Sequence, residues 1–123
     1  MILRWSIVRA SFDPAVGQEQ ARIRPALVVS NEPFNQATGS ATVVPLTTAR
    51  RPALSSEVLL PAGTGGLLVD PRLLIHHLRT ISQTRFRHPI YGRITDLGLR
   101  REIARRVLRH VAFDDLDALD LEP

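Results

Sequence analysis

The stretch Arg24-Pro25-Ala26-Leu27-Val28-Val29 decides the fold of this chain. Residues 26–29 form a continuous apolar run of strand length, which predicts a strand buried on both faces. Pro25 fixes its own φ and forces Arg24 into an extended conformation. We therefore expect the Arg24 guanidinium to point from a rigid strand start into the concavity of the polar loop at 13–24. There it either grips phosphate oxygens bidentately or pairs with Glu19.

Short apolar runs on either side of this stretch predict further strands. They cover residues 7–12, 41–46, 57–60 and 89–94, and turn residues separate them. Pro45 marks an edge or a bulge in the second of these strands. Residues 67–81 read as strands broken near Asp70-Pro71, because proline disfavours helix in the residue before it.

The polar connections between these runs carry two short helical signals. Residues 31–39 are expected to contain a helical turn around Phe34-Asn35, and Ser82 is expected to cap a turn through Phe86. Residues 47–56 read as a second long polar loop, which carries Arg50 and Arg51.

The hydrophobic period changes from strand to helix at Asp96. Thr95 is the expected N-cap, and Asp96 favours the positive end of the helix. The apolar stripe of this amphipathic helix comprises Leu97, Leu99, Ile103, Ala104, Val107, Leu108 and Val111, and Arg101, Arg105 and Arg109 line its solvated face. The expected architecture is a small, mainly β domain closed by a C-terminal helix, an α+β fold.

The charges divide the 123 residues into two parts. Residues 1–111 carry all 16 arginines and seven acidic residues, a net charge of +9. Residues 112–123 carry five acidic residues and no arginine, a net charge of −5. A basic body suggests a polyanionic partner, nucleic acid first.

The composition excludes several classes of protein. Without cysteine the chain has no disulfide framework, thiol nucleophile or thiolate metal site. No apolar run approaches the ~18–20 residues of a membrane span, and the first residues lack the apolar stretch of a secretory signal. We therefore expect a soluble cytoplasmic protein with no membrane partner and no cofactor. No metal site is expected from His76, His77, His88 and His110, which show no chelating spacing with carboxylates.

Two hydroxyl groups stand where the apolar strand at 41–46 gives way to the next loop. They belong to Thr47 and Thr48. Because threonine is a common β-branched strand residue, this pair alone indicates only the end of a strand.

Taken together, these segments resemble the MazF/PemK (Kid) toxins of type II toxin–antitoxin systems in their order and spacing. The resemblance spans about residues 4–111. The segments that carry it are Gly17-x-Glu19-Gln20, Arg24-Pro25-Ala26-Leu27-Val28-Val29-Ser30-Asn31, Phe34-Asn35, Val43-Val44-Pro45-Leu46-Thr47-Thr48, Glu57-Val58-Leu59-Leu60, Gly66-Leu67-Leu68-Val69-Asp70, Leu78-Arg79-Thr80-Ile81 and Gly92-Arg93-Ile94.

The resemblance implies a small SH3-like β-barrel of the CcdB/PemK type over residues 1–111, followed by an acidic tail at 112–123. It implies a homodimer that binds a cognate antitoxin, with which it forms a DNA-binding complex. The implied activity is that of an mRNA interferase: metal-independent, sequence-selective cleavage of single-stranded RNA. In this reaction the 2′-hydroxyl attacks the adjacent phosphate and leaves a cyclic phosphate and a 5′-hydroxyl.

The resemblance also implies which residues act. The family's catalytic arginine matches Arg24, and its catalytic threonine matches Thr47. A preorganised arginine stabilises the charge that develops on the phosphoryl oxygens, and a threonine hydroxyl can donate to the same oxygens. The implied RNA-binding residues are Glu19, Gln20, Arg22, Thr48, Arg50, Arg51, His77 and Arg79.

Two positions depart from the family pattern. The usual Gly-Asp near the start is Trp5-Ser6 here, and the usual Asp-Gln before the Ile-Arg-Thr stretch is His76-His77. An imidazole at His77 can serve as acid or base and make activity pH-dependent. Alternatively, one histidine packs inward and the other faces solvent, as neighbours on a strand do.

These departures leave two alternatives to the endoribonuclease. One is a gyrase-binding toxin of the CcdB type, which shares the fold. The other is a diverged, catalytically weak member that binds only RNA or antitoxin. The combination of Arg24-Pro25 with Thr47 favours the enzyme, because a gyrase binder needs no phosphate-directed arginine at that position.

The acidic tail is the part that the resemblance does not cover. Its five acidic residues are interleaved with Phe113, Leu116, Leu119 and Leu121. The tail either lies over a basic surface of its own or a partner subunit, as a mimic of antitoxin or RNA, or is a frayed, solubilising end.

Overall fold

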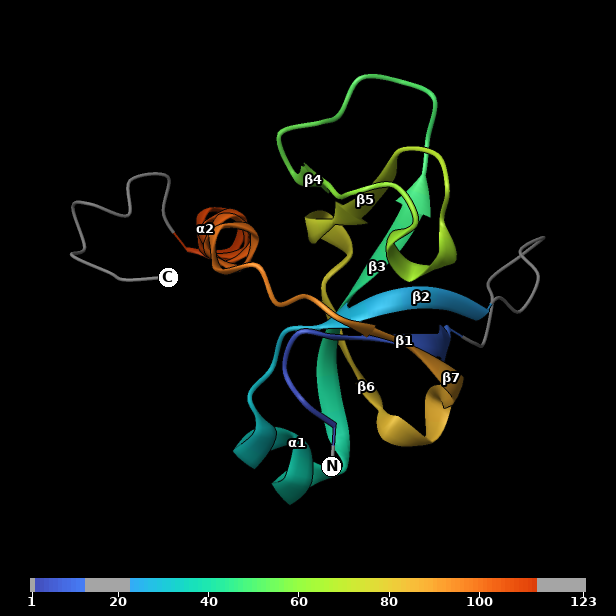
Figure 1. Cartoon of the computed structure of the whole chain (residues 1–123). Helices are drawn as coiled ribbons and strands as arrows, with labels where there is room; N and C mark the ends of the chain where they lie inside the picture. The colour runs from blue at the N-terminus through green and yellow to red at the C-terminus, as the bar shows by residue number, and fades with distance from the viewer. Residues whose placement is uncertain (1, 13–22, 113–123) are drawn as a thin grey trace, which may run out of the picture.

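The computed structural model describes residues 2–12 and 23–112, with residues 88–90 described by their backbone only (Figure 1). Three expected features therefore lie outside the described residues. They are the polar loop up to Arg22 with its expected RNA contacts Glu19 and Gln20, the pairing of Arg24 with Glu19, and the acidic tail beyond Ala112.

Seven antiparallel strands form the body of the molecule (Figure 1). They are β1 (Ser6–Ser11), β2 (Ile23–Val28), β3 (Ser40–Thr48), β4 (Glu57–Leu59), β5 (Pro71–Leu74), β6 (Arg79–Ser82) and β7 (Phe86–Arg93). Their order is β4-β5-β3-β2-β1-β7, and β6 also pairs with β3. The predicted α+β class is confirmed. The sheet is not closed into a barrel, because this order has two ends, at β4 and β7.

Strand β3 changes its neighbour along one edge. Residues 40–43 pair with β6, and residues 46–48 pair with β5. Pro45 lies in the interval between these two ladders. On the opposite edge of β3, Pro45 pairs with Ala26 of β2. Because proline has no N–H to donate, it fits where one neighbour strand ends and the next has not begun. The strand also runs on through Thr48, so Thr47 and Thr48 belong to β3 and not to the predicted loop.

The sheet buries apolar side chains on both faces, because successive residues of a strand point to opposite sides. Leu27 of β2 belongs to the larger cluster, and its neighbours Ala26 and Val28 belong to the smaller one. All three are fully buried, as the apolar run predicts. The larger cluster comprises Ile7, Leu27, Val44, Leu46, Val58, Leu60, Leu73, Ile75, Ile94 and Ile103, and the smaller comprises Val8, Ala10, Ala26, Val28, Ala41, Val43 and Ile81.

The helix α2 (Leu97–Val111) packs Ile103 into the larger cluster, with Leu99 and Val107 beside it. Its N-cap is Asp96 and not the predicted Thr95, because Asp96 has extended dihedral angles and its carbonyl accepts the amide of Arg100. The outer members of the predicted stripe, Leu97 and Val111, are exposed. Within the described part of the chain, no helix is long and apolar enough to cross a membrane.

The helix α1 (Glu32–Thr38) is longer than the single turn expected around Phe34. The Asn31 side chain accepts the Phe34 amide at its start, and Gly39 ends it with a φ of 68°. The predicted turn after Ser82 is confirmed as a 3₁₀ helix at Gln83–Arg85, and strand β7 begins directly after it.

Gly65 lies against the strand ends that carry the predicted catalytic pair. Its φ is 63°, and a Cβ there would lie 3.0 Å from both Leu46 Cδ2 and Pro25 Cβ. We expect Gly65→Ala to destabilise the fold by about 2–4 kcal/mol, through backbone strain and overpacking. The matched control is Gly63→Ala (φ 91°), where a Cβ meets nothing within 4 Å and strain alone costs about 1–2 kcal/mol. If urea denaturation gave the same loss of unfolding free energy for both variants, the packing around Gly65 would be loose enough to accept a Cβ.

Candidate functional site

Arg24 and Thr47 lie at matching ends of two paired strands. In the register of β2 and β3, Ala26 faces Pro45 and Val28 faces Val43. The ladder ends at the pair Ala26 and Pro45, and Arg24 and Thr47 each lie two residues beyond it. The two residues that the sequence singles out as catalytic therefore leave the β2–β3 ladder at the same end.

The Arg24 side chain is half-buried, and the backbone of Arg24 pairs with Ala10 of β1. Among the described residues, Arg24 has no hydrogen bond or ion pair through its guanidinium. As far as residues 2–12 and 23–112 are concerned, its donors are available to an anionic ligand.

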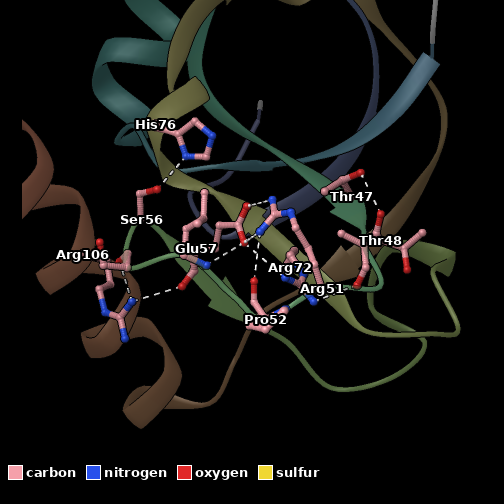
Figure 2. Close-up of polar contacts among 12 residues, drawn as sticks. Thr47, Thr48, Arg51, Pro52, Ser56, Glu57, Arg72, His76 and Arg106 are labelled. Carbon is pink, nitrogen blue, oxygen red and sulfur yellow. Dashed lines mark hydrogen bonds and ion pairs between the residues drawn. The ribbon is translucent and has the colours of Figure 1, made fainter.

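The two threonine hydroxyls have different hydrogen-bond partners, and Figure 2 shows that of Thr47. The Thr47 hydroxyl is 3.5 Å from the Thr48 carbonyl oxygen, at the limit of a hydrogen bond, so it can donate to a ligand instead. The Thr48 hydroxyl donates to the Val69 carbonyl oxygen. Thr48, an expected RNA contact, thus ties the end of β3 to the chain just before β5.

His77 lies at the end of a 3₁₀ turn, Ile75–His77, and is exposed. Its pKa is lowered from the usual 6.5, first by partial burial and then by the positive charges of His76 and Arg24. The effect of Arg24 shows that the guanidinium and this imidazole belong to one electrostatic neighbourhood. The lowered pKa favours the neutral form of the His77 imidazole at neutral pH.

His76 does not pack inward. Its ring stands edge-on to that of His77 at 4.5 Å, and its Nδ1 is 2.8 Å from the Ser56 hydroxyl (Figure 2). The expectation that one histidine of the pair is buried is wrong. The two residues sit on a 3₁₀ turn and not on a strand, so neighbouring side chains do not point to opposite faces.

Two further expected RNA-binding arginines, Arg79 and Arg50, lie on β6 and just after β3. Arg79 faces Val43 across the β6–β3 ladder, which places it on the face that also carries Thr47. Its guanidinium carbon lies 5.6 Å from the centre of the Phe12 ring. Arg50 follows β3, is exposed, and has no hydrogen bond or ion pair with any part of the chain that the structure describes.

Arg51, also expected to contact RNA, is held by Glu57. Its Nη1 and Nη2 donate to the two Glu57 carboxylate oxygens at 3.0 and 2.6 Å (Figure 2). Buried Arg72 donates to Glu57 Oε1 at 3.2 Å, and the Leu54 amide donates to the same oxygen at 3.0 Å. Arg72 also donates to the Ala49 carbonyl at 2.9 Å. We call this set the Glu57 clamp, and it fixes the loop between β3 and β4.

The clamp keeps Glu57 ionised at neutral and mildly acidic pH. The bond from Arg51 contributes most, with those from Leu54 and Arg72, and together they lower the pKa of Glu57 to about 2 against the opposing effect of burial. The sequence reasoning missed Glu57 and Arg72. The available signal was one carboxylate and one guanidinium within two otherwise apolar strands, since buried charges must be paired.

Among the described residues no group of three or more histidine, aspartate or glutamate side chains is placed to hold a metal ion. The site chemistry that the structure does present is a guanidinium, a hydroxyl and a neutral imidazole.

Comparison with known proteins gives a family match over almost the whole described chain. Residues 3–112 match the family described as PemK-like, MazF-like toxin of type II toxin-antitoxin system. The match covers the candidate site and the helix α2.

Named relatives agree with this match. The chain is 38% identical to endoribonuclease MazF9 of Mycobacterium tuberculosis over 100 residues, which are 77% of this chain and 84% of that protein. It is 31% identical to endoribonuclease EndoA of Bacillus subtilis over 86 residues, which are 69% of this chain and 74% of that protein. A MazE–MazF crystal structure from Deinococcus radiodurans superposes with a TM-score of 0.71 at 28% identity, covering 89% of this chain and 95% of that one.

Proposed function

Because the chain belongs to the PemK-like, MazF-like toxins of type II toxin–antitoxin systems, we propose that it is an endoribonuclease neutralised by a cognate antitoxin. Its reaction is the sequence-selective, metal-independent cleavage of single-stranded RNA, and it acts as a homodimer. Residues 1–111 form the toxin domain and 112–123 its tail. The names of MazF9 and EndoA support the activity, and the MazE–MazF complex supports a protein partner.

The observation that supports the proposal most is the antiparallel pairing of β2 with β3, since Arg24 and Thr47 lie at the same end of that ladder. Cleavage of RNA at phosphorus builds negative charge on the non-bridging oxygens of the transition state. A guanidinium and a hydroxyl held by strands stabilise such charge without reorganisation. The net charge of +9 on residues 1–111 supports binding of a polyanion.

The proposed reaction forms one bond and breaks one. The ribose 2′-oxygen bonds to the adjacent phosphorus, and the bond from phosphorus to the 5′-oxygen breaks, which leaves a 2′,3′-cyclic phosphate and a 5′-hydroxyl. Arg24 and Thr47 hold the non-bridging oxygens. His77, neutral at pH 7, accepts the 2′ proton, and water or a protonated neighbour supplies the proton of the leaving oxygen.

The product ends test this reaction directly. In buffer with excess EDTA, the purified protein is expected to cut long single-stranded RNA at an undiminished rate. The fragments should resist ligation at their 3′ ends until the cyclic phosphate is removed to leave a 3′-hydroxyl, and should accept phosphate at their 5′ ends from a polynucleotide kinase. RNA that stays intact at micromolar protein would reject the enzyme and favour a toxin that binds gyrase or one that binds RNA without cutting it.

The pH profile tests His77. Because its pKa lies below 6.5, kcat/KM for RNA cleavage is expected to be constant near pH 7 and to fall as the pH drops through that pKa. His77→Gln should remove this acidic limb and lower the plateau about 10²-fold or more. The control is His110→Gln, on the exposed end of α2, which should leave the limb in place. If the fall in kcat/KM at low pH persists in His77→Gln, the general base is a residue other than His77.

A further inference from the structure

A surface groove of about 420 Å³ opens beside the end of β3. One wall is the chain that continues β3, and the other is the turn that leads into β5. The groove is lined by Thr48, Ala49, Arg50, Gly66, Leu67, Leu68 and Val69. Thr48 follows Thr47 on β3, so this groove, which we call the Arg50–Leu68 groove, begins one residue from the candidate catalytic threonine.

The walls of the groove are fixed by contacts that do not involve a ligand. The Thr48 hydroxyl donates to the Val69 carbonyl across the groove. Arg72 of the Glu57 clamp donates to the Ala49 carbonyl at 2.9 Å. The Tyr91 ring packs against Gly66, where an added Cβ would lie 3.2 Å from the ring. The groove is therefore preformed, which lowers the entropic cost of binding.

The lining combines exposed apolar side chains with one cation. Two successive aliphatic side chains are exposed here, Leu68 to 77% and Val69 to 54%. The following Asp70 has a φ of 46°, an uncommon backbone conformation for a residue other than glycine. Two aliphatic side chains held outward by a constrained turn contribute nothing to the described core, so a ligand is a better explanation for them than folding.

We propose that the Arg50–Leu68 groove receives one nucleobase of the bound RNA and so determines base preference at one position. This rests on the proposed RNA-cleaving function. Leu68 and Val69 pack on the flat, apolar face of the base, as side chains do with unstacked RNA bases. The Arg50 guanidinium donates to acceptors on the base edge, which favours guanine with its two adjacent acceptors. The hydrogen bond from Thr48 to the Val69 carbonyl holds the two walls of the groove together.

The test measures base preference separately from cleavage. A randomised pool of 2′-O-methyl RNA, which cannot form the cyclic phosphate, is bound to the immobilised protein, and the retained sequences are counted. The same variants then cut a matched RNA pool, and the cut ends are mapped. The variants are Leu68→Ala/Val69→Ala and Arg50→Ala. Their matched controls are Leu97→Ala, which removes an equally large leucine that is 65% exposed on α2, and Arg101→Ala.

The wild-type protein is expected to prefer one base, guanine first, at a single position in both pools. The preference should fall about tenfold in Arg50→Ala and also in the double variant. Both controls should keep it. A profile that is unchanged in the groove variants overturns the groove assignment, even if the RNA is cut normally. Conversely, a groove-dependent preference in binding, without cleavage by the wild-type protein, supports the groove and rejects the proposed catalytic function.

Discussion

Arg24→Ala is expected to lower kcat/KM for RNA cleavage by about 10³-fold or more, with the fold intact. In the proposed reaction the Arg24 guanidinium stabilises the charge that develops on the phosphoryl oxygens, and removing such a group from phosphoryl or acyl transfer costs losses of this size. Arg24→Lys should recover only part of the activity, because an ammonium lacks the planar fork that holds two oxygens. A continuous cleavage assay on a fluorescent RNA measures both variants.

Two controls separate catalysis from binding and folding. Arg101→Ala removes the same charge from the exposed face of α2 and should cut RNA within about twofold of the parent. Affinity for 2′-O-methyl RNA should fall by only about tenfold in Arg24→Ala, since the loss belongs to the transition state. If Arg24→Ala cut RNA as fast as Arg101→Ala, the catalytic cation would have to be sought elsewhere.

The second large effect concerns stability. Glu57→Ala is expected to destabilise the protein by about 3–5 kcal/mol, because it leaves the buried Arg72 guanidinium without its counter-ion. Thermal unfolding should occur roughly 10–20 °C lower. The control is Glu102→Gln, which breaks an i,i+4 pair with Arg106 at the surface and should cost less than about 1 kcal/mol. Similar losses from the two substitutions would show that the clamp adds little to stability.

The same carboxylate makes stability depend on pH in one direction. The pKa of Glu57 is about 2 in the folded protein and near 4.5 in the unfolded chain. Its contribution is therefore complete above pH 4.5 and is lost as the pH falls from 4.5 toward 2. Glu57→Gln is expected to flatten this part of the curve of unfolding free energy against pH, and a curve of unchanged slope would assign the acid sensitivity to other carboxylates.

Local signals in the sequence were enough to predict β2, the strand that carries Arg24. An apolar run and a proline define β2 without reference to any other part of the chain, and its burial is as predicted. The helix α1 had local signals too, in the Asn31 cap and Gly39. Its polar composition led to the prediction of a single turn, whereas the caps at both ends stabilise seven residues.

Features that depend on pairing across the sheet were not predictable in this way. The Glu57 clamp exists because β4 and β5 are neighbours and because Arg51 returns along the preceding loop. The separations of Glu57 from Arg51 and from Arg72 along the chain do not reveal that these side chains meet in space. The same reason explains why the contact of Arg51 with Glu57 was not predicted. Its position in a loop indicated a guanidinium exposed to solvent or bound to RNA, but the guanidinium pairs with Glu57. The pairing of β2 with β3, which leaves Arg24 and Thr47 at the same end of one ladder, also depends on the sheet, whereas the sequence linked these two residues only through family resemblance.

The change of neighbour along β3 at Pro45 has an evolutionary consequence. The half of β3 that pairs with β6 adjoins Arg79, and the half that pairs with β5 adjoins the Arg50–Leu68 groove and the clamp. No ladder along that edge of β3 is continuous across Pro45, so insertions and substitutions in the β4–β5 half need not be matched in β6. On the proposed function, substitutions in the β4–β5 half can therefore change the RNA sequence that this protein attacks while the pairing of β3 with β6 stays the same.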